Sequence, residues 1–111
     1  MRGRMLLLLF VLNFSLGCLQ ELTEPALTAR EAYERGQQSL RDDSRLDEAI
    51  DYFKKAADAG YPNAHLVLGD LYREGAVVPY DQDLAVSHYL SGSEAGLIEA
   101  SSRLEEISNA Q

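Results

Sequence analysis

The sequence predicts an all-α fold, in which a short α-solenoid of two helix-turn-helix repeats and a C-terminal capping helix follow an N-terminal signal peptide. The first observation is an internal repeat: residues 47–64 (DEAIDYFKKAADAGYPNA) align without a gap on residues 83–100 (DLAVSHYLSGSEAGLIEA), at an offset of 36 residues. A period of roughly 20–50 residues is typical of stacked helical pairs. The second observation is that apolar residues in and between these segments recur at helical spacing.

The composition describes one small acidic protein. The chain has 111 residues, a quarter of them charged, and a formal net charge of −8. This length holds a single small domain. The negative charge argues against nucleic acid or an anionic lipid surface as the main ligand. Cys18 is the sole cysteine, so an internal disulfide is impossible.

Residues 1–17 have the layout of an export signal. Arg2 and Arg4 precede an unbroken apolar run at residues 5–12, which is the charged-then-apolar order of a secretory signal peptide. The run is shorter than the roughly 20 apolar residues that a membrane-spanning helix needs. We therefore expect this segment to direct the chain to its compartment rather than to form part of the fold.

The end of that run resembles the lipobox of bacterial lipoproteins. Residues 14–18 read Phe-Ser-Leu-Gly-Cys, and the resemblance implies cleavage before Cys18, which would then carry a diacylglycerol and acyl chains such as palmitate. Leu19 follows where an Asp resembles an inner-membrane retention signal, so the resemblance favours the outer membrane. Residues 18–27 would be a tether. An ordinary signal peptide with an incidental cysteine is the alternative.

The first helical pair is predicted over residues 28–60. Thr28 and Glu31 fit a capping box, in which each side chain accepts a hydrogen bond from the other residue's backbone N–H. After a polar turn, a second helix is predicted at residues 46–59. Gly60 follows it, as expected for a residue that ends a helix in the left-handed conformation.

The second pair is predicted over residues 61–96, followed by a cap at residues 97–109. Its first helix spans residues 62–74, with proline at the first helical position. Asp81 can cap its second helix, which runs to about Ala95 and stops at Gly96. The cap resembles the first helix of a third unit, and its polar outer face is predicted to comprise Ser102, Arg103, Glu105 and Glu106.

One motif identifies the kind of repeat. The second unit reads Ala64-x-x-x-Leu68-Gly69-x-x-Tyr72-x-x-Gly75, followed by Asp81, Ala85, Tyr89 and Ala95-Gly96. This pattern resembles the Sel1-like repeat, a relative of the tetratricopeptide repeat with a longer turn between its helices. In the first unit the turn is shorter, and Gln37 stands where the signature glycine is expected. The resemblance covers about residues 29–107 and implies a non-catalytic helical scaffold that binds other proteins, often in envelope or secretion pathways.

Few residues suggest chemistry. His65 and His88 are the only histidines, and we expect packing or surface roles because no further histidine or cysteine completes a zinc site. Asp47, Glu48 and Asp51 lie at a predicted helix start, where acidic side chains interact favourably with the helix dipole. We therefore expect no catalytic residue, metal or cofactor. An enzyme acting on envelope polymers is the rival reading, and it would need a clustered pair of titratable groups.

A partner is expected on the concave surface, which first helices mostly line in this superfamily. Helical spacing places there Glu31, Glu34, Arg35, Gln38 and Arg41 from the first pair, and Asn63, Val67, Asp70 and Arg73 from the second. The mixed charge suits an extended polypeptide better than a small metabolite. A plain solvated face is the alternative.

The sequence thus predicts an envelope-anchored interaction scaffold, attached to the membrane through a lipid on Cys18 and bound to protein partners. The first alternative is a self-associating structural component of an envelope or exopolysaccharide-secretion complex. The second is a secreted or periplasmic adaptor without lipid. Because about three repeats are normally needed for stability, two pairs and a cap predict marginal stability unless the chain self-associates or docks on a partner.

Overall fold

The computed structural model describes residues 26–111. The predicted signal peptide, the cleavage and lipidation at Cys18, and nearly all of the tether lie outside the described residues. Within residues 26–111 no helix combines the length and the apolar character that crossing a bilayer requires.

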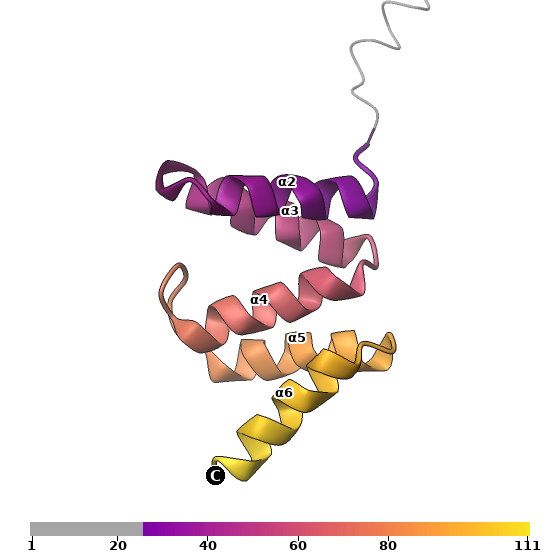
Figure 1. Cartoon of the computed structure of the whole chain (residues 1–111), viewed down its shortest axis with the longest axis vertical. Coiled ribbons are helices and arrows are strands. Elements are labelled where there is room, and N and C mark those ends of the chain that lie inside the picture. Colours follow the sequence, from indigo (N-terminus) through magenta and orange to yellow (C-terminus); the bar gives the residue numbers. More distant parts are fainter. Residues whose placement is uncertain (1–25) are drawn as a thin grey trace, which may run out of the picture.

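Five α-helices and one short 3-10 helix make up this part of the chain, which contains no strand. They are α2 (Ala29–Leu40), η1 (Asp43–Arg45), α3 (Leu46–Asp58), α4 (Pro62–Glu74), α5 (Gln82–Glu94) and α6 (Ile98–Asn109). The helices α2 and α3 form one antiparallel hairpin, α4 and α5 form the next, and α6 crosses the end of the stack (Figure 1). The predicted α-solenoid is confirmed.

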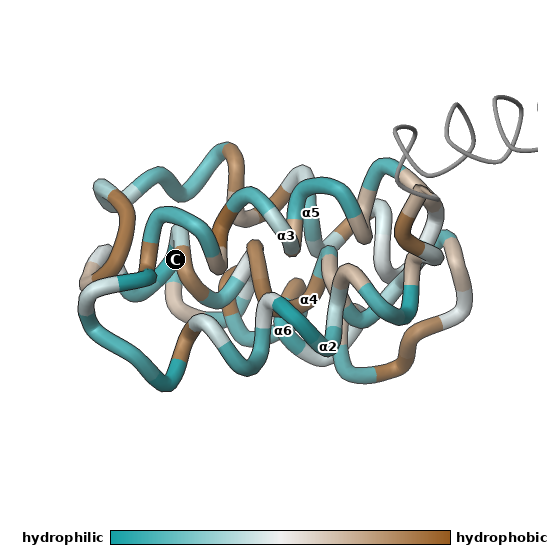
Figure 2. Tube along the Cα trace, turned by 90° about the horizontal axis from the view of Figure 1, so that it is seen from above, coloured by the Kyte–Doolittle hydropathy of each residue, from teal (hydrophilic) through white to brown (hydrophobic). Residues whose placement is uncertain are grey.

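Seen along the stack, the helices form two layers. The helices α3 and α5 lie on one side and α2, α4 and α6 on the other, with apolar residues gathered between them (Figure 2). The side chains buried there include Phe53, Leu68 and Tyr89. Each hairpin therefore buries its apolar face against its own partner helix and against the neighbouring hairpin, as stacked repeats require.

Local signals place the helix ends. Thr28 and Glu31 form the predicted capping box, with the Glu31 N–H donating to Thr28 Oγ1 and the Thr28 N–H donating to Glu31 Oε2 at 2.9 Å. Asp81 Oδ1 accepts from the Leu84 N–H at 3.0 Å. Left-handed backbone ends the helices at Gly60, Gly75 and Gly96, with φ of 87°, 68° and 92°. The predicted helix bounds agree with the structure to within one residue at each end.

Two glycines let an aromatic ring lie directly on a helix backbone. A Cβ atom built on Gly36 would lie 2.8 Å from Phe53 Cε1, and one built on Gly69 would lie 2.5 Å from Tyr89 Cε1. Interiors packed to this density have no room for an added methyl group. In each hairpin, therefore, an aromatic ring of the second helix packs on a glycine of the first helix and joins the two helices.

This contact corrects the prediction for Gln37. Gln37 is exposed and donates through Nε2 to the Tyr33 hydroxyl at 3.0 Å, while its neighbour Gly36 fills the role of the signature glycine. The physical reason is the turn: residues 41–45 connect α2 to α3, whereas residues 75–81 connect α4 to α5. The shorter turn shifts the first helices, so Gly36 corresponds to Gly69 although Phe53 corresponds to Tyr89 at the full repeat offset.

Candidate functional site

Three of the predicted partner-binding residues lie together at the α2 edge of the stack. Glu31 and Arg35 line a hollow of about 640 Å³. Arg35 and Gln38 line an adjoining hollow of about 200 Å³. We call the two hollows together the edge groove. Its lining residues are Ala26, Leu27, Thr28, Glu31, Arg35, Gln38, Ser39, Arg45, Tyr52 and Lys55.

The edge groove lies between α2 and α3, on the face that stacks in a repeat array. Applying the shift set by the glycines, Glu31, Arg35 and Gln38 correspond to Ala64, Leu68 and Leu71 of α4. Those three α4 side chains are buried in the core that also contains Phe53 and Ile50 of α3. The second hairpin thus covers this face with α3, and within residues 26–111 no helix covers it in the first hairpin.

The other two predicted residues of the first hairpin are exposed elsewhere on α2. Glu34 accepts from Arg30 Nε at 2.9 Å, and both side chains are more than half exposed. Arg41 caps the C-terminal end of α2. Exposed ion pairs of this kind are worth little, so Arg30, Glu34 and Arg41 present a solvated surface.

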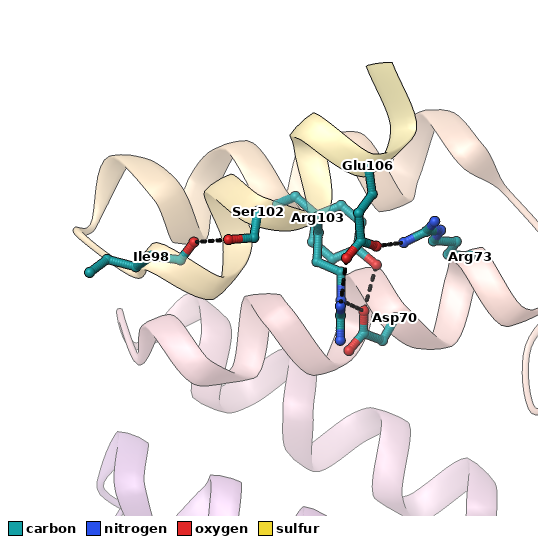
Figure 3. Close-up of polar contacts among 7 residues, drawn as sticks. Asp70, Arg73, Ile98, Ser102, Arg103 and Glu106 are labelled. Carbon is teal, nitrogen blue, oxygen red and sulfur yellow. Dashed lines mark hydrogen bonds and ion pairs between the residues drawn. The ribbon is translucent and has the colours of Figure 1, made fainter. Parts of the chain in front are cut away.

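The predicted α4 residues are engaged within the chain. Asp70 Oδ1 accepts from the Tyr89 hydroxyl at 2.6 Å and from Arg103 Nε at 3.0 Å. Arg73 Nη1 donates to Glu106 Oε2 at 2.9 Å, and Arg103 Nη1 donates to Glu106 Oε1 at 3.3 Å. Figure 3 shows these side chains converging between α4 and α6. Asp70 and Arg73 therefore contact α6. Glu106 is exposed, as predicted for the outer face, whereas Arg103 is half-buried against Asp70.

Charge and burial tune this network. Burial raises the pKa of the Tyr89 hydroxyl well above its ordinary value, and its hydrogen bond to the Asp70 carboxylate raises it further. The hydrogen bond from Arg73 lowers the pKa of Glu106. Tyr89 thus stays a neutral donor and Glu106 an ionised acceptor over the ordinary pH range. Asn63 and Val67 are half-buried, and Val67 packs against the apolar core.

The structure brings the two histidines together. His65 Nδ1 and His88 Nδ1 lie 3.1 Å apart, and the Tyr72 ring stacks on His88 with an interplanar angle of 3°. The ring centroids are 5.4 Å apart. For two nitrogens 3.1 Å apart, the centroids are farthest apart when both nitrogens lie on the line between them, and 5.4 Å is close to that maximum. The two nitrogens therefore point at each other along the line between the rings, and one ring donates the proton that the other accepts.

This geometry suits a shared proton better than a metal ion. Two ligands of one metal ion direct their lone pairs at a common point, whereas the histidine nitrogens face each other. In residues 26–111 no group of three histidine, cysteine, aspartate or glutamate side chains is arranged to hold a metal. Burial lowers the pKa of His88, and the charges of His65 and Lys54 lower it further against the opposing effect of Asp58.

The sequence carried a signal for this pair that spacing alone did not reveal. His88 adjoins Tyr89, and His65 lies one turn before Gly69. Both histidines therefore flank the contact that holds α4 to α5. Recognising them as neighbours requires the rotation of each helix about its axis, which the glycine contact fixes.

Comparison with known families agrees with the architecture. The family model of the Sel1 repeat matches residues 26–61 and residues 62–97. A search of curated proteins and a search of solved structures gave no match. Each matched segment contains one helical hairpin, α2 with α3 and α4 with α5. Because the two matches together span well over half of the chain, this protein belongs to the Sel1 repeat family.

Proposed function

We propose that this protein is an interaction scaffold of the bacterial cell envelope, anchored through a lipid on Cys18 and acting by recruiting and positioning protein partners. Sel1 repeats generally mediate protein–protein interaction, and two of them span residues 26–97. That match is the observation that carries the proposal. Binding and positioning require no turnover, so the scaffold acts without a catalytic step.

The described structure supports this role because it presents side chains on rigid elements. The contacts of Gly36 with Phe53 and of Gly69 with Tyr89 lock each hairpin. The ion pairs of α6 with Asp70 and Arg73 add contacts at the other end of the stack. A partner that docks on such a surface meets pre-positioned side chains, which reduces the entropy lost on binding.

The anchor rests on the sequence. Residues 14–18 resemble a lipobox that ends in the sole cysteine, and Leu19 favours the outer membrane, facing the periplasm. Acyl chains stabilise membrane attachment by about 0.8 kcal/mol per buried methylene, so several chains hold a protein on the bilayer almost permanently. The tether at residues 18–27 would keep the repeats within reach of partners at that surface.

Intact mass spectrometry of the protein from membranes of a bacterial expression host tests the anchor. We expect a chain that begins at Cys18 and carries added acyl mass, and we expect Cys18→Ala to remove both the cleavage and the mass. A product cleaved elsewhere, unmodified and soluble, would contradict the anchor. It would leave a diffusible adaptor that uses the same repeats.

Crosslinking tests the scaffold independently of the anchor. A photoreactive amino acid placed at Gln38 samples the edge groove, and one placed at Arg41 samples the exposed end of α2. We expect a discrete crosslinked protein from at least one of the two positions in native membranes. Absence of any discrete product at both positions would contradict the scaffold.

A further inference from the structure

We propose that the edge groove binds an acidic, extended segment of a partner protein. The inference rests on the proposed function, since it names the partner class and the surface that the scaffold would use. Three features of the groove support it: polar side chains at stacking positions, cations without a carboxylate partner, and an exposed amide.

Another repeat cannot pack on the groove in the way that α3 packs on the second hairpin. The α4 side chains that meet α3 are apolar, namely Ala64, Leu68 and Leu71. The α2 side chains at the same positions are Glu31, Arg35 and Gln38, which are exposed. Burying them under an apolar helix would leave charged and amide groups without partners, at a cost of several kcal/mol. A partner must therefore satisfy polar groups here.

Two cations of the groove have no carboxylate partner, and one of them, Lys55, lies over the Tyr52 ring with its Nζ 5.6 Å from the ring centroid. The Glu31 carboxylate accepts from the Thr28 N–H and hydroxyl at 2.9 and 3.0 Å, and Arg45 is held in two hydrogen bonds by Glu48. Arg35 and Lys55 form no ion pair with any residue of the described chain.

These cations stand out against a chain whose net charge is −8. Carboxylates of a partner would complement Arg35 and Lys55, which lie on facing helices and line the same hollow. Charge-assisted hydrogen bonds from a guanidinium to a carboxylate are about twice as strong as neutral ones. Charge complementarity therefore selects an acidic occupant.

The remaining groups favour an extended backbone over a helix. Gln38 presents an exposed amide in the smaller hollow, and the half-buried Tyr52 ring lies between the two hollows. An extended segment offers free backbone N–H and C=O groups to such side chains, whereas a helix uses those groups internally.

The same features favour a peptide over an anionic membrane. Electrostatic interactions are screened over about 8 Å at physiological ionic strength. A short acidic segment would meet mainly the cations of the groove. An extended anionic surface would also meet the surrounding acidic residues, and the net charge of −8 would repel it.

Fluorescence anisotropy with a labelled heptapeptide tests the proposal on the full chain in detergent. The probe alternates Glu with Leu and Phe, and its matched control carries Gln in place of every Glu. We expect the acidic peptide to bind and the control peptide to bind about tenfold more weakly. Arg35→Gln and Lys55→Gln should each weaken acidic-peptide binding about five- to tenfold.

Arg30→Gln is the matched control variant, because it removes the same charge from the same helix at an exposed position paired with Glu34. We expect it to change the affinity less than twofold. Loss equal to that of Arg35→Gln would overturn the proposal, since it would mean that only net charge matters. Absence of acidic-peptide binding at about 1 mM would also overturn it.

Other occupants have their own outcomes, each of which overturns the proposal. Displacement of the peptide by phosphatidylglycerol vesicles, but not by phosphatidylcholine vesicles, would assign the groove to a lipid headgroup. A dimer in sedimentation that Arg35→Gln dissociates would assign it to a second copy. Tighter peptide binding after Glu21→Gln and Glu24→Gln would assign it to the tether of the same chain.

The crosslinking experiment separates this inference from the proposed function. A partner captured from Arg41 but never from Gln38 would leave the scaffold standing and remove the edge groove. A partner that is crosslinked from Gln38, and no longer crosslinked in the Arg35→Gln variant, would support both the scaffold and the edge groove if the acidic peptide also binds as expected.

Discussion

The two hairpins share one packing device but differ in what surrounds it. In the first, Phe53 lies on Gly36, and its ring ends in an apolar environment beside Tyr33. In the second, Tyr89 lies on Gly69, and its hydroxyl donates to Asp70. The Tyr89 hydroxyl therefore connects the core of the second hairpin to the ion pairs between α4 and α6.

The hairpins also differ in how many of their faces are covered. The second hairpin packs against α3 on one side and α6 on the other. The first hairpin packs against α4, and the described chain leaves its opposite side open as the edge groove. Apolar side chains at the stacking positions thus let the second hairpin pack on α3, whereas polar side chains at the same positions of the first hairpin form an exposed surface.

Replacing each glycine under its ring should give the largest effect. Gly69→Ala forces a Cβ to 2.5 Å from a ring whose hydroxyl is bound to Asp70, whereas Gly36→Ala meets a Phe53 ring without a hydroxyl at 2.8 Å. Overpacking costs about 1–3 kcal/mol or more, offset by up to about 1 kcal/mol of helix propensity. We expect Gly69→Ala to destabilise more in urea unfolding. An equal or larger loss for Gly36→Ala would contradict the role of the hydroxyl.

Exchanging the ring types should give the next largest effect. Tyr89→Phe leaves Asp70 without its closest donor and should cost about 1–2 kcal/mol. Phe53→Tyr places a hydroxyl in a fully buried position, where an unsatisfied group costs about 1–3 kcal/mol. Urea unfolding of both variants checks the pair. If Phe53→Tyr were neutral, the first hairpin would have a concealed partner for the hydroxyl.

Much of this fold could be predicted because its signals are local. The capping box of Thr28 and the glycine after each hairpin act within a few residues. Helix ends follow from such signals without knowledge of the tertiary structure. The internal repeat then supplied the stacking order.

The rest depends on the rotation of helices about their axes, which spacing does not fix. Because the turn after α2 is shorter than the turn after α4, the glycine under the aromatic ring is Gly36, whereas the sequence pattern placed it at Gln37. Arg103 and Glu106 of α6 pair with Asp70 and Arg73 of α4, although Glu106 stays exposed. Periodicity assigned residues to faces of single helices, and contacts between helices decided what each face meets.

The histidine pair should give a moderate, pH-dependent effect that only the second hairpin shows. The folded state lowers the pKa of His88, so the unfolded chain binds more protons below about pH 6.5. The stabilising contribution is therefore complete above about pH 6.5 and is lost as the pH falls toward the folded pKa.

Urea unfolding at pH 7.5 and at about pH 5.5 measures this contribution, in a range above the titration of most carboxylates. We expect lower stability at the lower pH, and a smaller difference in His88→Gln. The groups that face the pair are Lys54 and Asp58 of α3 and Tyr72 of α4. Tyr52 stands at the corresponding position of the first hairpin, so Tyr52→Phe, which leaves both histidines in place, is the control. An unchanged pH difference in His88→Gln would assign the effect to other groups.

The smallest expected effect is at the end of the stack. Arg103→Met breaks the ion pairs with Asp70 and Glu106, whose side chains are a third to a half exposed. Such pairs contribute about 0–1 kcal/mol, so global stability should barely change. Hydrogen exchange should quicken in α6 and stay the same in α2 and α3. Arg30→Met, which breaks an ion pair within α2, is the control and should leave α6 unchanged.

The alternative outcome bears on what holds α6 in place. The Ala100 side chain packs on the backbone of α5, since a Cβ at Gly92 would lie 3.1 Å from the Ala100 Cβ. Ser93 and Ser101 add a hydroxyl pair at 2.7 Å. If these contacts dominate, Arg103→Met loosens only the far end of α6. A loss of several kcal/mol would instead mean that the charges around Asp70 hold α6 to the second hairpin, and that this hairpin depends on α6 for its own stability.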